Sequence, residues 1–151
     1  HLRGVRVASL IIGILMVGFV GHLYSEGASS KTLPPPTVSG LNCPAKPNCV
    51  SSLAAGDHYI APLQIFGPKP IEQLMTALQK AELIIEQHSK VYLHATATSA
   101  VFGFVDDIHI LLPLKANGQF EVRSMSRVGY SDLGANRERI EELRMILNNQ
   151  G

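Results

Sequence analysis

The residues best suited to chemistry lie close together near the middle of the chain. Asp107 and His109 are two positions apart, so in a β-strand both side chains project from the same face. Hydrogen-bonded Asp–His pairs activate nucleophiles, but no Gly-x-Ser-x-Gly motif accompanies this pair. Asp107 and His109 therefore form a candidate acid–base pair without an evident nucleophile.

A second polar group follows about fifteen residues later. Arg123 and Arg127 lie on one face of a predicted strand and, with Tyr130, form a candidate anion site.

The alternative to an anion site is a structural role for these arginines. Asp106 projects from an apolar strand face, where a carboxylate needs a partner, and an ion pair with Arg123, Arg127 or Arg137 would supply one. Ion-pair networks gather the same residue types, so the structural explanation is favoured.

Composition excludes several other classes of function. The net charge is +1, with both signs interspersed, so no nucleic-acid partner is expected. The sequence has no tryptophan and 6% aromatic residues, which argues against a carbohydrate-stacking surface. We see no metal-binding quartet and no phosphate-binding loop, and we expect no metal and no cofactor.

Hydrophobic periodicity predicts the elements that hold these residues. A helix is predicted over 70–81, and Pro70 suits its first turn. Strands are predicted over 83–85, 91–98, 101–112 and 120–127, and an amphipathic helix near the C-terminus carries a stripe of Ile140, Leu143 and Leu147. The predicted fold class is α+β, with an N-terminal transmembrane helix followed by a four-stranded antiparallel meander with helices packed on one face.

The two cysteines, Cys43 and Cys49, enclose a loop with two prolines. Redox pairs usually have two intervening residues instead of five, and zinc would need further ligands. We predict a structural disulfide.

An uncharged apolar run spans 7–24, after Arg3 and Arg6. Its eighteen residues would span about 27 Å as a helix, close to the thickness of a bilayer core. It is long for a signal peptide, and the candidate cleavage sites after it, Ser25-Glu26-Gly27 and Glu26-Gly27-Ala28, each contain a charge, so we predict a signal anchor over 1–24. The positive-inside rule places the N-terminus in the cytoplasm and the remainder in the periplasm. Residues 25–42 form a Pro-rich linker, and 43–151 form a soluble domain.

Small residues in the apolar run indicate a helix–helix contact with other integral membrane subunits. They are Ser9, Gly13, Gly18 and Gly21. An ionisable residue in a membrane span suggests function, and the spacing of Gly18 and His22 resembles that by which light-harvesting helices hold a chlorophyll. Because His22 lies near the end of the run, beside Tyr24, an interfacial residue is favoured over a pigment ligand.

Four ordered motifs resemble those of the bacterial and plastid family called domain of unknown function 1499. They are Pro47-Asn48-Cys49-Val50-Ser51-Ser52, Tyr92-Leu93-His94-Ala95, Phe104-Val105-Asp106-Asp107, and the segment from Arg123 to Gly134, continued by Asn136-Arg137. The resemblance covers about 43–147 and implies no reaction, substrate or cofactor. The motif residues also have structural explanations: Gly129 and Gly134 suit positive φ, and Ser131 or Asp132 suits a helix cap.

Two functional hypotheses remain. In the first, the protein is a membrane-anchored periplasmic accessory subunit of a larger complex in the inner membrane. In the second, it is a tethered enzyme or small-anion-binding protein that uses Asp107, His109, Arg123 and Arg127. The first is favoured because no complete catalytic constellation is present.

Overall fold

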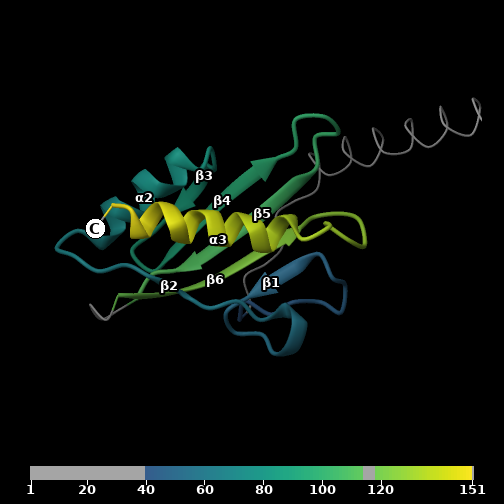
Figure 1. Ribbon diagram of the computed structural model, residues 1–151, viewed down its shortest axis with the longest axis horizontal. Coiled ribbons are helices and arrows are strands. Elements are labelled where there is room, and N and C mark those ends of the chain that lie inside the picture. Colours follow the sequence, from purple (N-terminus) through teal and green to yellow (C-terminus); the bar gives the residue numbers. More distant parts are fainter. Residues whose placement is uncertain (1–39, 114–117, 151) are drawn as a thin grey trace, which may run out of the picture.

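A computed structural model describes residues 40–113 and 118–150. Within these ranges the chain forms six strands, a short 3₁₀ turn and two α-helices (Figure 1). In chain order they are β1 (Cys49–Ser51), η1 (Gly56–His58), β2 (Leu63–Gln64), α2 (Pro70–Lys80), β3 (Ile84–His88), β4 (Tyr92–Thr98), β5 (Val105–Leu111), β6 (Gln119–Ser126) and α3 (Ala135–Asn148).

The strands form an antiparallel sheet in the order β1-β6-β5-β4-β3. The two short strands pair with β6, whose other edge is bonded to β5. Met125, near the end of β6, faces Cys49 of β1, whereas Phe120, near its beginning, faces Leu63 of β2. The long central strands therefore carry the sheet, and the N-terminal part of the domain completes its edge.

Both helices described by the structure lie on one face of the sheet (Figure 1). This face supplies the apolar core, because alternate residues of the strands project toward the helices. Leu93, Ile108, Ile110 and Val122 from the strands are fully buried there. From the helices they meet Leu74, Leu78, Ile140 and Leu143.

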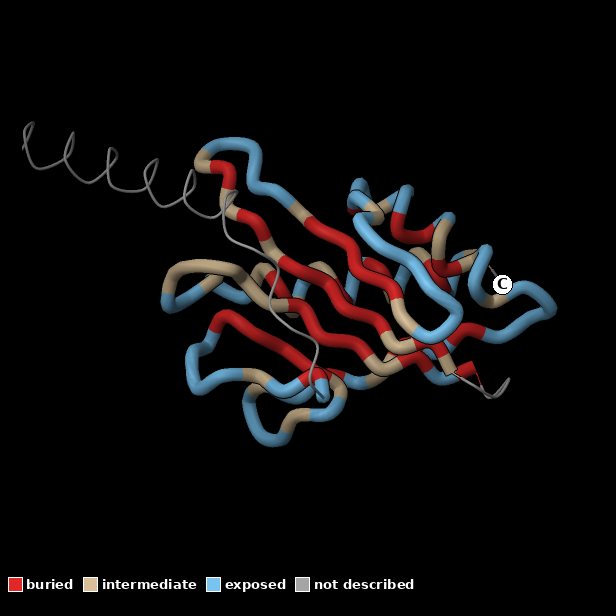
Figure 2. Tube along the Cα trace, turned by 180° about the vertical axis from the view of Figure 1, so that it is seen from behind, coloured by how far each residue is buried: buried red, intermediate tan, exposed pale blue. Residues whose placement is uncertain are grey.

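The opposite face of the sheet is polar and yet buried. Figure 2 views the molecule from this side, where the central strands run as buried segments with neither α2 nor α3 in front of them. The intervening residues of the same strands, His94, Asp107, His109 and Arg123, project here. We call it the polar face. It positions the candidate site described below.

The predicted four-stranded meander is wrong as a description of the sheet. Strands β3 to β6 do follow one another as neighbours, but β1 and β2 make six strands among the described residues. Strands of three and two residues are too short to show an alternating pattern, and their pairing with β6 joins positions far apart in the sequence. Local periodicity therefore could not reveal them.

The strand predicted over 101–112 also begins later than expected. Val105 is the first residue of β5, because a turn occupies the preceding positions. The amide of Ser99 donates to the carbonyl of Phe104 at 2.9 Å and closes this turn. Gly103 lies within it at φ +68°, a conformation that glycine adopts without strain.

Neither α2 nor α3, the α-helices of the described ranges, has the length and apolar character needed to cross a bilayer. The run at 7–24, predicted to be a transmembrane helix, lies outside the described residues. So do the predicted packing residues Ser9, Gly13, Gly18 and Gly21, and the candidate pigment ligand His22.

Candidate functional site

A row of polar side chains crosses the polar face from strand to strand. His94 of β4 pairs with His109 of β5, and His109 in turn pairs with Arg123 of β6. Asp107 lies two residues from His109 and projects from the same face. We call these residues, with Tyr92 and Arg127, the polar cluster.

Asp107 is fully buried, and both of its carboxylate oxygens are hydrogen-bonded. Oδ1 accepts from Nε2 of His94 at 2.7 Å and from Nη2 of Arg127 at 3.0 Å. Oδ2 accepts from Nε of Arg127 at 2.9 Å. Burial alone would raise the pKa of the Asp107 carboxyl, but the bonds from His94 and Arg127 outweigh it and lower that pKa. Asp107 is therefore an ionised, satisfied carboxylate at neutral pH.

His109 is 1% exposed and stacks on His94, with ring centroids 4.7 Å apart. Its Nδ1 is hydrogen-bonded to the hydroxyl of Tyr92. Burial, assisted by the charge of Arg123, lowers the pKa of His109 to about 4, so its ring is neutral at neutral pH. Nε2 of this ring is buried and has no hydrogen-bond partner in the described part of the chain.

Arg123 is the most unusual member of the cluster. Its residue is 4% exposed, and Nη1 donates to the carbonyl of Asn42 at 2.9 Å. Nε and Nη2 are buried without a hydrogen-bond partner within 40–113 and 118–150. Burial lowers the pKa of the guanidinium below its ordinary value, while nearby Tyr92 and Asp107 oppose this change. Arg123 thus holds a buried positive charge and two unused donors.

The charges of the cluster favour an anion over a cation. Arg123 and Arg127 bring two positive charges; Asp107 and, more distantly, Glu86 act on Arg127, whereas Arg123 has no carboxylate bonded to it within the described residues. One ligand atom from each of His94, Asp107 and His109 lies within 4.8 Å of the others, a spacing that could hold a metal ion. However, both oxygens of Asp107 already bind cationic or N–H donors, and a divalent ion would add charge beside two guanidiniums.

The structure brings together four of the five residues predicted for catalysis or anion binding. Asp107, His109, Arg123 and Arg127 all belong to the polar cluster. Tyr130 does not join them. It follows β6 in a turn, is 69% exposed, and lines cavities beside Asp132 near the beginning of α3.

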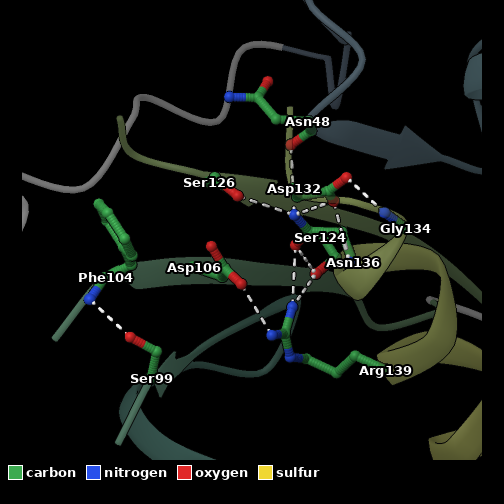
Figure 3. Close-up of polar contacts among 10 residues, drawn as sticks. All are labelled: Asn48, Ser99, Phe104, Asp106, Ser124, Ser126, Asp132, Gly134, Asn136 and Arg139. Carbon is green, nitrogen blue, oxygen red and sulfur yellow. Dashed lines mark hydrogen bonds and ion pairs between the residues drawn. The ribbon is translucent and has the colours of Figure 1, made fainter. Parts of the chain in front are cut away.

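Asp106 forms the ion pair expected of a carboxylate on the apolar face, but the predicted partner is wrong. Nη2 of Arg139, on α3, donates to Oδ2 of Asp106 at 2.7 Å (Figure 3). Arg123 and Arg127 project to the opposite face of the sheet. Arg137 donates instead to the carbonyls of Tyr59 and Asp57.

Asn136 organises a second polar network at the start of α3 (Figure 3). The residue is fully buried, and its Oδ1 accepts from Ser124 at 2.6 Å and from Arg139 at 2.9 Å. Its Nδ2 donates to the Asn48 carbonyl, to Oγ of Ser126 and to Oδ2 of Asp132. This network connects the loop before β1, strand β6 and helix α3, so its role is structural.

The N-cap residue of α3 is Gly134, and Asp132, two residues earlier, binds the first amides of the helix. Its Oδ2 accepts from the backbone N–H of Asn136 at 3.0 Å, and its Oδ1 accepts from that of Gly134. Burial alone would raise the pKa of Asp132, but the bonds from Asn136 outweigh it and lower that pKa. Gly134, at φ +85°, provides the predicted left-handed entry to the helix.

A cavity of about 510 Å³ opens beside this network. Phe104, Val128 and Leu133 contribute apolar walls, and the Asp106–Arg139 pair contributes polar lining. Asp106 and Arg139 pair with each other, and the carboxylate of Asp132 is hydrogen-bonded to Asn136 and Gly134, in contrast to the guanidinium of Arg123 on the other face, which has no carboxylate partner in the described ranges.

The predicted disulfide between Cys43 and Cys49 is confirmed. It ties the loop before β1 to the sheet. Asn42, whose carbonyl accepts from Arg123, directly precedes this covalent loop, and Ser51 of β1 donates to the carbonyl of Leu41. The disulfide therefore helps to hold the Leu41–Asn42 backbone, which contacts Arg123, against the sheet.

Two members of the cluster, Tyr92 and His94, were not predicted as site residues. Both belong to one of the motifs quoted above, and they alternate with apolar residues in the strand at 91–98. That alternation places them on one face, but only the pairing of β4 with β5 brings His94 against His109.

The four sequence motifs quoted above lie within a region of the chain that matches a protein-family model. Among curated proteins, none matches this chain. Residues 41–147 match the sequence model of a family described as "Protein of unknown function (DUF1499)". The arginines of the polar cluster and the asparagine network both fall within the matched region, and the chain belongs to the DUF1499 family.

Proposed function

We propose that this domain binds a small anion at the polar cluster, with Arg123 as the charged anchor. The observation that carries the proposal is the environment of its guanidinium, which is buried and has Nε and Nη2 without partners among the described residues. Burying a charge without a counter-ion costs several kcal/mol. A bound anion would supply both the missing charge and the missing acceptors.

The other members of the cluster support this role. Arg127 neutralises Asp107, and the hydrogen bond from His94 helps to orient it, so that carboxylate is not free to pair with Arg123. His109 lies directly across the ladder from Arg123 and offers Nε2 as a further polar atom. Its ring is neutral at neutral pH, a state in which one nitrogen can donate and the other accept.

An anion must pass the described segment that contacts the guanidinium. This segment is Leu41–Asn42, held to the sheet by one hydrogen bond to Arg123 and one from Ser51. These two hydrogen bonds contribute about 1 kcal/mol each, and the fully buried side chain of Leu41 contributes about 2 kcal/mol more. Displacing the segment therefore costs about 4 kcal/mol, the same order as the cost of leaving the charge of Arg123 buried and unpaired.

Isothermal titration calorimetry on the purified chain tests the proposal. Sodium acetate, sulfate and phosphate are titrated at constant ionic strength, with sodium chloride as the reference. We expect at least one of these anions to bind the wild-type protein. Arg123→Gln removes the charge and should abolish binding. Lys69→Gln removes a positive charge from an exposed side chain and should leave binding unchanged.

Circular dichroism first establishes that each variant is folded. Absence of binding to the folded wild-type protein, or equal binding by Arg123→Gln, contradicts the proposal.

The accessory-subunit role at the periplasmic side of the inner membrane stays a prediction, because it depends on residues 1–24, outside the described residues. Gentle detergent extraction and identification of co-purifying membrane proteins test it separately.

A further inference from the structure

We infer that the anion is a small hydroxycarboxylate, whose carboxylate binds side-on to Arg123 and whose hydroxyl group contacts His109. This inference rests on the proposed function and assigns a chemical class to its ligand. It follows from which nitrogen atoms of the cluster are occupied and which are not.

The unused donors of Arg123 form a fork. In a planar guanidinium, the N–H of Nε and one N–H of Nη2 point in nearly the same direction, along one side of the group. These are the two nitrogens without partners, whereas Nη1 is held by the Asn42 carbonyl. Two parallel donors match the two oxygens of one carboxylate.

The neighbouring arginine shows this arrangement with its partner in place. Arg127 uses the same two nitrogens, Nε and Nη2, to bind the two oxygens of Asp107 at 2.9 and 3.0 Å. Arg123 lies four residues earlier on the same face and has no such carboxylate in the described ranges. The ligand carboxylate would do for Arg123 what Asp107 does for Arg127.

His109 specifies the second group of the ligand. Directly opposed residues in an antiparallel ladder have Cβ atoms about 5 Å apart, so the side chains of His109 and Arg123 are neighbours on the polar face. Nδ1 is already bonded to Tyr92, which leaves Nε2 as donor or acceptor according to the tautomer. A hydroxyl group both donates and accepts, so it satisfies Nε2 in either state.

The charge of the site argues against phosphate. Arg127 is balanced by Asp107, with Glu86 as a further negative neighbour, so the charge left to balance is the single positive charge of Arg123, which a carboxylate matches. Inorganic phosphate near neutral pH is a mixture of monoanion and dianion, and the dianion would leave an excess negative charge in a buried site.

Calorimetric titration with sodium glycolate, acetate and phosphate, at equal ionic strength, tests the inference. We expect glycolate to bind about tenfold more tightly than acetate, because the hydrogen bond of its hydroxyl group to neutral His109 is worth about 1 kcal/mol. We expect acetate to bind more tightly than phosphate, because the phosphate dianion brings an excess negative charge. Arg123→Lys keeps the charge but removes the fork, and should weaken glycolate binding at least about tenfold.

A second variant separates the two contacts. His109→Phe keeps a ring of similar shape and should remove the preference of glycolate over acetate while acetate binding persists. Lys69→Gln is again the exposed control. If phosphate binds as well as glycolate and binding is lost in Arg123→Gln, the inference is overturned and the proposed function stands. If no anion binds the folded wild-type protein, both fail.

Discussion

Arg127 donates two parallel hydrogen bonds to the fully buried carboxylate of Asp107, and His94 donates a third to the same group. This pair satisfies one of the two arginines on the polar face and leaves Arg123 without a carboxylate in the described structure. The two arginines therefore have opposite energetic consequences. Arg127 stabilises the fold through its ion pair, whereas Arg123 retains a buried charge that a ligand can neutralise.

Removing the charge of Asp107 should destabilise the domain strongly. Asp107→Asn leaves Arg127 without its counter-ion and alters the acceptor of the hydrogen bond from His94, and we expect the free energy of unfolding to fall by about 3 kcal/mol. Asp106→Asn is the matched control on the adjacent residue, whose ion pair with Arg139 is partly exposed and worth about 1 kcal/mol. Urea denaturation measures both. A larger loss for Asp106→Asn would contradict this assignment.

Arg123 should contribute little to stability. Arg123→Met removes a buried charge and the bond to Asn42, so we expect the free energy of unfolding to stay unchanged or to rise by about 1 kcal/mol. Arg127→Met, the matched change four residues later, should lower it by about 3 kcal/mol because Asp107 loses its partner. Thermal melting compares them. Equal destabilisation by both variants would show that Arg123 is a structural residue.

Stability should fall as the pH decreases from about 6.5 to about 4. His109 has a pKa of about 4 in the folded protein, below the ordinary 6.5, so in this window the unfolded chain binds a proton that the folded chain does not. The stabilisation is complete above the unfolded pKa and is lost below the folded one. Allowing for solvent screening, we expect a loss of about 2 kcal/mol.

Denaturation at a series of pH values checks this expectation, with His109→Phe as the comparison. The variant should show a shallower dependence between pH 6.5 and 4. Below that window, wild-type protein and variant should both lose stability as Asp107 takes up a proton, because its pKa is lowered in the folded state. Identical slopes above pH 4 would rule out His109 as the source.

The asparagine network predicts one strongly destabilising substitution. Asn136→Ala leaves Ser124, Arg139 and Asp132 without a buried partner, and we expect a loss of about 3 kcal/mol. Asn149→Ala, at an exposed position just beyond α3, should change stability by less than about 0.5 kcal/mol. Urea denaturation decides between them, and similar values for the two variants would disprove a central role for Asn136.

Opening the disulfide should affect both stability and ligand binding. Replacing Cys43 and Cys49 together with Ser removes the constraint on a short loop, and we expect a loss of about 2 kcal/mol. Because that loop follows Asn42, the orientation of Arg123 should also relax and anion affinity should decrease. Denaturation and calorimetry on the double variant test the two effects, and unchanged values in both would refute the connection.

Local pattern was sufficient for the long elements. The spacing of apolar residues after Pro70 predicted α2 almost to its last residue, and alternation predicted β4 and β6 within one or two positions. Strands β1 and β2 were not predicted, because strands of three and two residues are too short for a repeating alternation of apolar and polar residues to be recognised.

The candidate site shows the same division. The two-residue period of a strand is enough to predict that Asp107 and His109 share a face and that Arg123 and Arg127 share a face, and the spacing of the two cysteines is enough to predict that they close a loop. Which of these side chains meet one another depends on the packing of the strands and helices. The strand register places His109 between His94 and Arg123. The docking of α3 brings Arg139 into an ion pair with Asp106, and the turn after β6 places Tyr130 in an exposed position outside the polar cluster. The physical reason is that register and helix docking depend on burying the whole apolar face at once, a sum over residues that no local stretch of sequence contains.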